Sequence, residues 1–414
     1  MTTGTGSPAR CWVPGASGSG FDVDHLPFGV FQAGSEPPRV GVRIGDHVLA
    51  AGLAAERAGM ESGHRWEGAS IAPFLALGPR AWQSARDWLT LVLTEPEYRD
   101  AIEPHLHPVQ DVTMLLPLQI GDYVDFYASD HHASALGRLF RPDSEPLLPN
   151  WKHLPVGYHG RSGTVVVSGT PIIRPRGQLK APGADAPTFG PSVRLDIEAE
   201  LGFLVGTGST LGTPVSAAAF ADTVFGVTLV NDWSARDIQS WEYVPLGPFL
   251  GKSFGTSISP WITPLAALAA ARVPPRPRTV PLLDYLADDP EQPWGLDISL
   301  EVAWNGTVVS RPPYAAAMYY TPAQMLAHLT VNGASVRTGD LYASGTISGP
   351  EPDQAGSFIE LTAGGRRPVS LADGSSRTFL KDGDTVTISA SAPSTSGGRL
   401  TLGSVTGTIQ PART

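Results

Sequence analysis

A run of alternating apolar and polar residues between positions 194 and 205 is the clearest pattern in the chain. Its apolar members include Leu195, Ile197, Ala199 and Leu201. This period of two predicts a β-strand in which Glu198 and Glu200 share one face, with their backbones roughly 7 Å apart. Two carboxylates so placed can converge on one cation. Taken alone, the pair is more typical of a strand edge with its acids in solvent.

The same alternation occurs around Asp125. It places Tyr123, Asp125 and Tyr127 on one face of a short strand. An unpaired carboxylate among Val, Phe and Tyr would be costly to bury, so we expect a positive partner for Asp125.

A third acid, Asp232, precedes a segment with helical spacing. If a helix begins at position 231 or 232, positions 232, 236, 239 and 243 fall within roughly 60° of one another and collect Asp, Arg, Gln and Tyr on one face. The flanking Trp233 and Trp241 favour a helix packed inside the protein. The alternative is an N-cap Asp with a salt bridge to Arg236.

Other patterns predict the remaining organisation. Residues 40–49 form two β-like runs around a Gly-Asp turn, which predicts a hairpin. Helical spacing follows between 66 and 102, and a Pro-punctuated linker places a domain boundary near 118. Residues 1–20 are expected to form a flexible arm, and 264–296 a peripheral helix and loop insertion without a chemical role.

Composition narrows the class of protein. The 414 residues are 42% hydrophobic and 16% charged, and 46 Gly with 39 Pro favour a mainly β (α+β) protein with many turns. A net charge of -10 argues against nucleic acid as a partner. Cys11 is the only cysteine, so an intrachain disulfide cannot form. No apolar run is long enough to span a membrane, and the N-terminal residues do not resemble an export signal. We therefore expect a cytoplasmic protein without a membrane partner.

Two further features carry possible chemistry. The glycine loop 250–256 has the wrong spacing for a phosphate loop, so it is better read as presenting the Lys252 ammonium to an anionic centre. His132 lies seven residues beyond Asp125, where it could act as a base near a bound ion. Spacing alone does not choose among His131, His132 and His159.

Five blocks of the chain resemble the fumarylacetoacetase family. They are DYVDFYAS (122–129), LPNWKHLPVGYHGR (148–161), NDWSARDIQ (231–239), WEYVPLGPFLGKSFGT (241–256) and ASGTISG (343–349). The resemblance implies a small N-terminal SH3-like β-barrel over 21–118, a large C-terminal mixed β-sandwich roll over 119–414 that carries the active site, and a homodimer. The family's metal positions map onto Asp125, Glu198, Glu200 and Asp232, which suit Ca²⁺ or Mg²⁺. A second Mg²⁺ is implied near Lys252 and Thr256.

The reaction implied by the resemblance is hydrolysis of a carbon-carbon bond in a diketo acid, 4-fumarylacetoacetate, in the last step of tyrosine and phenylalanine breakdown. The products are fumarate and acetoacetate, and a divalent cation would polarise the diketone and stabilise the departing enolate. The base matches His132, oriented by Glu360. The oxyanion would be stabilised by Arg236, Gln239 and Lys252. The residues implied in substrate binding are Tyr127, Arg141, Tyr158, Gln239, Tyr243 and Thr346.

Two alternatives stay open at this point. The wider superfamily contains other carbon-carbon hydrolases, hydratases and decarboxylases that share the metal carboxylates, but these usually lack the long N-terminal domain. A non-catalytic cation-binding protein would have the same carboxylates for a structural reason.

Overall fold

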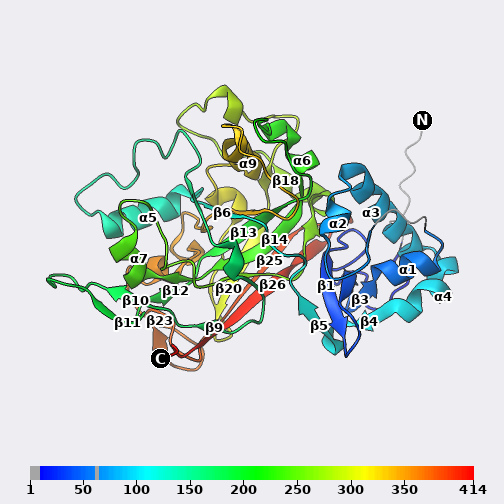
Figure 1. Cartoon of the computed structure of the whole chain (residues 1–414), viewed down its shortest axis with the longest axis horizontal. Helices are drawn as coiled ribbons and strands as arrows, with labels where there is room; N and C mark the ends of the chain where they lie inside the picture. Colours follow the sequence, from blue (N-terminus) through cyan, green and yellow to red (C-terminus); the bar gives the residue numbers. More distant parts are fainter. Residues whose placement is uncertain (1–9, 61–64) are drawn as a thin grey trace.

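The computed structural model describes residues 10–60 and 65–414, which form a smaller N-terminal body beside a larger one (Figure 1). The N-terminal body contains a curled antiparallel sheet in the order β4-β3-β2-β1-β5. Its strands are β1 (Phe28–Ala33), β2 (Arg39–Ile44), β3 (His47–Ala50), β4 (Leu106–Pro108) and β5 (Val112–Leu115). Its helical segments are α1 (Ala51–Arg57), α2 (Ala72–Leu75), α3 (Pro79–Thr94), η1 (Pro96–Tyr98), α4 (Arg99–Ile102), η2 (Glu103–His105) and η3 (Val109–Asp111).

The local patterns explain these elements. Antiparallel β2 and β3 are joined at Gly45, whose φ of 54° is the left-handed conformation that suits glycine, and this confirms the predicted hairpin. In α3, Pro79 occupies the first turn, where its missing N–H costs nothing. The helix buries Ala85, Leu89 and Leu93 as their spacing predicts.

The larger body is built on an eight-stranded mixed sheet and a five-stranded sheet. The first has the order β7-β6-β22-β13-β14-β16-β8, with β17 beside β14. Its strands are β6 (Tyr123–Phe126), β7 (Gly157–His159), β8 (Val165–Val167), β13 (Ala199–Val205), β14 (Val224–Asp232), β16 (Thr256–Ile258), β17 (Thr263–Pro264) and β22 (Leu341–Ala343). The second contains β21 (Thr307–Ser310), β20 (Ser299–Trp304), β25 (Thr385–Pro393), β26 (Arg399–Gln410) and β9 (Ile172–Ile173).

Shorter elements surround the two sheets. The paired ribbons are β10 (Arg176–Leu179) with β11 (Thr188–Pro191), β12 (Leu195–Asp196) with β15 (Ser234–Ala235), β18 (Arg272–Val273) with β19 (Gly295–Leu296), and β23 (Val369–Ser370) with β24 (Ser376–Arg377). The helices are α5 (Asp130–Phe140), α6 (Phe220–Thr223), α7 (Arg236–Glu242), α8 (Tyr314–Ala317), α9 (Pro322–Thr330) and α10 (Phe358–Leu361). The 3₁₀ segments are η4 (Ser162–Thr164), η5 (Ala217–Ala219), η6 (Leu265–Ala271), η7 (Asp284–Leu286) and η8 (Pro352–Gln354).

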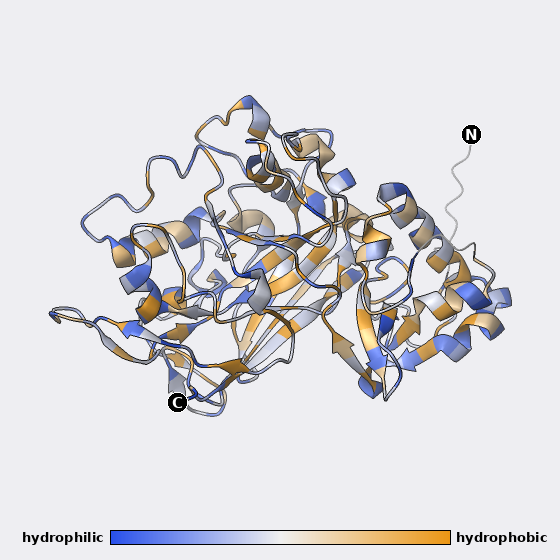
Figure 2. Ribbon diagram, viewed as in Figure 1, coloured by the Kyte–Doolittle hydropathy of each residue, from blue (hydrophilic) through white to orange (hydrophobic). Residues whose placement is uncertain are grey.

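The central strands β13 and β14 are buried along their whole length, whereas β25 alternates between buried and half-buried positions. Residues of β13 and β14 divide between two hydrophobic clusters, one shared with β25 and β26 and one shared with the N-terminal body. Hydrophobic colour accordingly concentrates on the central strands in Figure 2. The predicted mainly β architecture is confirmed: the expected SH3-like N-terminal unit is a curled antiparallel half-barrel, and the expected mixed β-sandwich roll is the larger body with its curled sheets.

Two predictions about the region after β14 were wrong. Asp232 is the last residue of β14 rather than the start of a helix, because it pairs with Thr256 of β16 and its amide donates to the Glu198 carbonyl at 3.1 Å. The helix α7 begins only at Arg236. Trp233 is fully buried, but Trp241 is 42% exposed, so only the first of these tryptophans packs in the core.

Two segments expected at the periphery are partly packed. Residues 1–9 of the expected arm lie outside the described residues, but Cys11, Val13 and Ala16 are buried, so this part of the chain is not a free arm. In the expected insertion 264–296, four residues of η6 are buried in the core of the larger body. Across residues 10–60 and 65–414, no helix combines the length and apolar character needed to cross a membrane.

Candidate active site

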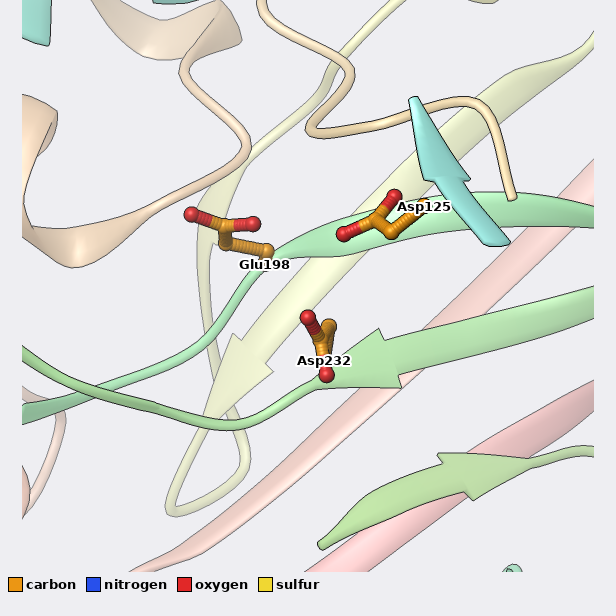
Figure 3. A group of neighbouring side chains, drawn as sticks. All are labelled: Asp125, Glu198 and Asp232. Atoms are coloured by element: carbon orange, nitrogen blue, oxygen red, sulfur yellow. The ribbon is translucent and has the colours of Figure 1, made fainter. Parts of the chain in front are cut away.

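Three carboxylates meet where strands of the eight-stranded sheet end. Asp125 lies on β6, Glu198 directly precedes β13, and Asp232 closes β14. Each offers an oxygen within 4.8 Å of the others, and their side chains point toward one another in Figure 3. Asp125 is 1% exposed, Glu198 5% and Asp232 1%. The alternative of a solvent-facing strand edge is therefore excluded.

Glu200 is fully buried beside this group without belonging to it. Neither of its carboxylate oxygens, nor Asp125 Oδ1, accepts a hydrogen bond from any described residue. Burial, and then the charge of Asp125, raises the pKa of Glu200 well above its usual range. Burial and the charge of Asp232 do the same to the pKa of Asp125. Buried carboxylates with unsatisfied oxygens fit a bound cation, which would supply the missing positive charge.

Four donors surround the other carboxylate oxygens. Lys252 Nζ lies 2.5 Å from Glu198 Oε2 and 3.2 Å from Asp232 Oδ2, so the glycine loop does present its ammonium to an anionic centre. The Tyr158 hydroxyl donates to Asp125 at 3.0 Å or to Asp232 at 2.8 Å. Thr256 Oγ1 donates to Asp232 Oδ1 at 2.7 Å. The fourth donor is Arg236, whose Nη1 lies 2.7 Å from Glu198 Oε1.

Burial opposes the charged form of Glu198. The ammonium of Lys252 and the guanidinium of Arg236 outweigh that effect and hold the pKa of Glu198 well below its usual range. Glu198 is therefore ionised. Asp125 and Glu200 are the two carboxylates of the site that still lack a positively charged partner.

A histidine and a glutamate form a pair beside the carboxylates. His132, in the first turn of α5, places Nδ1 2.6 Å from Glu360 Oε2, while its Nε2 lies 3.6 Å from Glu198 Oε1 without a hydrogen-bond partner among the described residues. Ser348 and Ser357 also donate to Glu360 Oε2. Because an ionised carboxylate only accepts, Nδ1 carries the hydrogen and Nε2 is left as the proton acceptor of the neutral ring.

The charges around His132 affect its protonation. Burial alone would lower the pKa of the imidazole, but Glu360 and Glu198 overcome that effect and raise the pKa to about 9. A cation bound by Glu198 would oppose this rise, because it would neutralise part of the charge that favours the imidazolium. The proton affinity of His132 and the occupancy of the carboxylate group are therefore linked.

The structure separates the three candidate histidines. His131 Nε2 lies 3.1 Å from Arg276 Nη1 and 3.7 Å from Asp130 Oδ1. His159 is exposed and lines a second cavity, which Asp232, Lys252 and Thr256 also reach. Only His132 of these three contacts Glu198.

A cavity of about 350 Å³ opens beside the site. Asp125, Glu198 and Lys252 reach its wall, and apolar residues such as Phe140 and Leu147 line the remainder. The residues predicted to bind substrate that line this cavity are Tyr127, Arg141, Tyr158, Gln239 and Tyr243. Thr346 is buried outside this lining, and its hydroxyl has no hydrogen-bond partner among the described residues.

Sequence reasoning missed the residues that support the site. Asp196 is fully buried, and its carboxylate lies 2.7 Å from Arg236 Nε. It occupies the same alternation as Glu198 and Glu200, so period two could have revealed it. The contact of Ser348 with Glu360 had no local sequence signal, because 12 positions separate the two residues. Ser357 lies only three positions before Glu360, so the Ser-x-x-Glu pattern at the start of α10 could have revealed that pair.

The fold and the site define an enzyme of the hydrolase class with a carboxylate group that could hold a metal ion. Residues 24–117 match the family model described as fumarylacetoacetase N-terminal, and residues 123–410 match fumarylacetoacetate (FAA) hydrolase C-terminal. The chain belongs to the fumarylacetoacetase family.

Individual relatives agree over nearly the whole chain. The fumarylacetoacetase of Bos taurus is 44% identical over 97% of this chain and 99% of its own length. The fumarylacetoacetases of Homo sapiens and Arabidopsis thaliana are 43% and 44% identical with the same coverage. Among solved structures, a fumarylacetoacetate hydrolase from Exiguobacterium antarcticum superposes with a TM-score of 0.52 at 17% identity, covering 94% of this chain and 100% of that one. That structure supports the fold alone.

Proposed function

We propose that this protein hydrolyses 4-fumarylacetoacetate to fumarate and acetoacetate. The observation that carries the proposal is the orientation of His132. Glu360 holds its Nδ1, and its Nε2 has no hydrogen-bond partner among the described residues and lies 3.6 Å from Glu198. The family membership, and fumarylacetoacetases at 44% identity among the relatives, support the same substrate.

In this mechanism His132 is the general base. Its Nε2 takes a proton from water as the water oxygen bonds to the carbonyl carbon next to the fumaryl group. Glu360 stabilises the resulting imidazolium through Nδ1. Collapse of the tetrahedral species breaks the carbon-carbon bond, leaves its electron pair on the acetoacetate carbon, and returns the proton from His132 to that carbon.

Arg236, Gln239 and Lys252 would stabilise the oxyanion. Arg236 Nη1 donates to Gln239 Oε1 at 3.0 Å, which orients the amide, and Arg236 Nη2 has no partner among the described residues. A preorganised donor without a partner is suited to a charge that develops only during the reaction.

Asp125, Glu198, Glu200 and Asp232 would hold a divalent cation. Oxygen-only ligands favour Mg²⁺ or Ca²⁺ over zinc. When bound, such an ion supplies Lewis-acid polarisation of the two ketone oxygens and stabilises negative charge on the departing group. A second ion near Lys252 and Thr256 has less support, because the ammonium cannot be a ligand and already contacts two of the carboxylates.

The substrate would lie in the 350 Å³ cavity against Tyr127, Arg141, Tyr158 and Tyr243, with Thr346 as a further contact. Arg141 suits a terminal carboxylate, because its buried Nε has no hydrogen-bond partner among the described residues. We further propose a cytoplasmic homodimer with domains divided near residue 118.

The first test is the loss of the diketone ultraviolet absorbance of 4-fumarylacetoacetate, measured with chelator and with added Mg²⁺ or Ca²⁺. Cation-dependent loss with fumarate and acetoacetate as products is expected. No loss with a cation bound would overturn the substrate assignment and direct the search to other diketo acids of the superfamily.

A further inference from the structure

We infer that Asp196 is a positioning residue that holds the oxyanion-stabilising Arg236 and the Glu360–His132 pair in one fixed arrangement. The inference rests on the proposed function. Asp196 ends β12, two positions before Glu198, and its side chain is completely buried. It touches neither His132 nor the group of Asp125, Glu198 and Asp232 by any hydrogen bond or ion pair between described residues.

Both oxygens of Asp196 are fully engaged. Oδ1 accepts from the amides of Phe358 at 2.7 Å and Ile197 at 2.8 Å. Oδ2 accepts from Arg236 Nε at 2.7 Å and from the Ile359 amide at 3.1 Å. Four donors in different directions determine the orientation of this carboxylate, and a buried charge with these bonds is compensated.

The contacts lead to two separate parts of the site. Arg236 uses Nε for Asp196 and Nη1 for both Glu198 and Gln239, so the bond to Asp196 sets the plane of the whole guanidinium. Phe358 and Ile359 form the first turn of α10, and the next residue is Glu360. One carboxylate therefore joins the guanidinium to the backbone that carries the partner of the base.

A second link reinforces this arrangement. The Ala199 amide donates to the Gly356 carbonyl at 2.9 Å, so the segment 196–199 contacts the chain on both sides of Ser357. Since general acid–base and oxyanion catalysis both depend on distances within hydrogen-bond reach, a small displacement of α10 relative to Arg236 would lower turnover.

Asp196→Asn tests the inference with little change in volume. One of the two oxygens becomes an NH₂ group that must face either Arg236 Nε or backbone amides, so at least one donor loses its acceptor. We expect kcat to fall by about 10- to 100-fold with KM changed less than about twofold, because the residue acts on the transition state and not on substrate contacts. Rates are compared per folded protein, from urea unfolding curves.

A double-mutant cycle separates positioning from bulk stability. In a Glu360→Gln background the partner of the base is already impaired, so Asp196→Asn should lower kcat there by a smaller factor than in wild type, and the loss that remains is the part that acts through Arg236. A purely structural residue would instead change the unfolding midpoint and leave kcat per folded molecule unchanged. Asp384→Asn is the matched control, because Asp384 is also buried and accepts from a backbone amide and Asn305, yet lies outside the site.

Each outcome decides the question. Unchanged kcat, or the same fold-loss in both backgrounds, overturns the inference. Failure of Asp196→Asn and of a second variant, Asp196→Ser, to unfold cooperatively also overturns it, because the residue is then needed for folding. Failure of the wild-type protein to hydrolyse fumarylacetoacetate contradicts the proposed function instead, and is seen before any variant is made.

Discussion

At the scale of single residues, the site is short of positive charge. Asp125, Glu198, Glu200 and Asp232 are all buried, and Lys252 and Arg236 are the cations that contact them. The raised pKa values of Asp125 and Glu200, caused first by burial, are the direct consequence. A bound divalent ion would offset this negative charge.

Removal of the cation should therefore destabilise the folded state. An ion present at 100 times its dissociation constant stabilises the native protein by about 2.7 kcal/mol. We expect the melting temperature to fall when excess chelator is added to the magnesium- or calcium-loaded protein, and to recover when the ion is restored. The same melting temperature with and without chelator would contradict a cation at this site.

The role of the base can be tested at one position. His132→Ala should lower kcat by about 10²- to 10⁴-fold, because a general base acts in the transition state, while KM changes little. His159→Ala is the matched control, since no ion pair joins this exposed histidine to the carboxylates among the described residues, and the variant should retain turnover. Equal losses in the two variants would remove the basis for choosing His132.

The sequence could predict the carboxylates because they follow a local rule. Period two places Asp196, Glu198 and Glu200 on one face regardless of what packs there. The same rule could not select His132 over His159, since that choice depends on Glu360, which is 228 positions away from His132. Nor could this rule identify the hydrogen-bond donors to Asp196, which are the Arg236 side chain and backbone amides of α10.

At the scale of elements, predictions from spacing failed where sheet pairing decides the conformation. The run from Val224 to Asp232 continues as a strand because β13 and β16 satisfy its backbone on both sides. The helical spacing of Arg236 and Gln239 is real, but α7 starts at Arg236. Local propensity is a weak guide when long-range hydrogen bonds compete with it.

The close packing of α5 against the loop at Pro146 gives an element-scale prediction. A Cβ at Gly137 would collide with the Pro146 carbonyl oxygen and lie 2.7 Å from its carbon. Pro146 and Leu147 line the 350 Å³ cavity in which we propose that the substrate binds, and Arg141 Nη2 donates to the Pro146 carbonyl at 3.0 Å. Gly137→Ala should therefore raise KM and destabilise the protein by about 1–3 kcal/mol, although Ala is the better helix former.

Steady-state kinetics and urea unfolding check this expectation. Gly398→Ala is the control, because a Cβ there meets no atom within 4 Å and its φ is not in the left-handed region. It should leave both KM and stability nearly unchanged. A Gly137→Ala protein that is more stable than wild type would show that the loop moves away at no cost.

At the scale of the whole molecule, the two bodies share one hydrophobic cluster. It contains Val30 and Phe74 from the N-terminal body together with Phe225, Val230 and Leu341 from the larger sheet. Composition and turn signals could predict a boundary near 118. They could not predict that one face of β13 and β14 packs against the N-terminal body. The burial of Cys11 and of η6 belongs to the same long-range packing.

His25 lies at the contact between the two bodies. Its Nδ1 donates to the Gly20 carbonyl at 2.9 Å, and its Nε2 is 2.9 Å from Thr263 Oγ1 of β17. Burial lowers the pKa of His25 to about 4, and the guanidiniums of Arg86 and Arg43 act in the same direction. The ring is therefore neutral in the folded protein near pH 7.

Acid should weaken this contact. An unfolded chain protonates His25 with a pKa of about 6.5, so between pH 6.5 and pH 4 the unfolded state binds more protons, and stability falls as the pH falls. From pH 7 to pH 5 this group should account for about 2 kcal/mol of lost unfolding free energy. Urea unfolding of wild type and His25→Gln at both pH values isolates the effect, because the carboxylates titrate in both proteins. The wild-type protein should lose about 2 kcal/mol more than the variant, and equal losses would show that His25 is not held neutral between the two bodies.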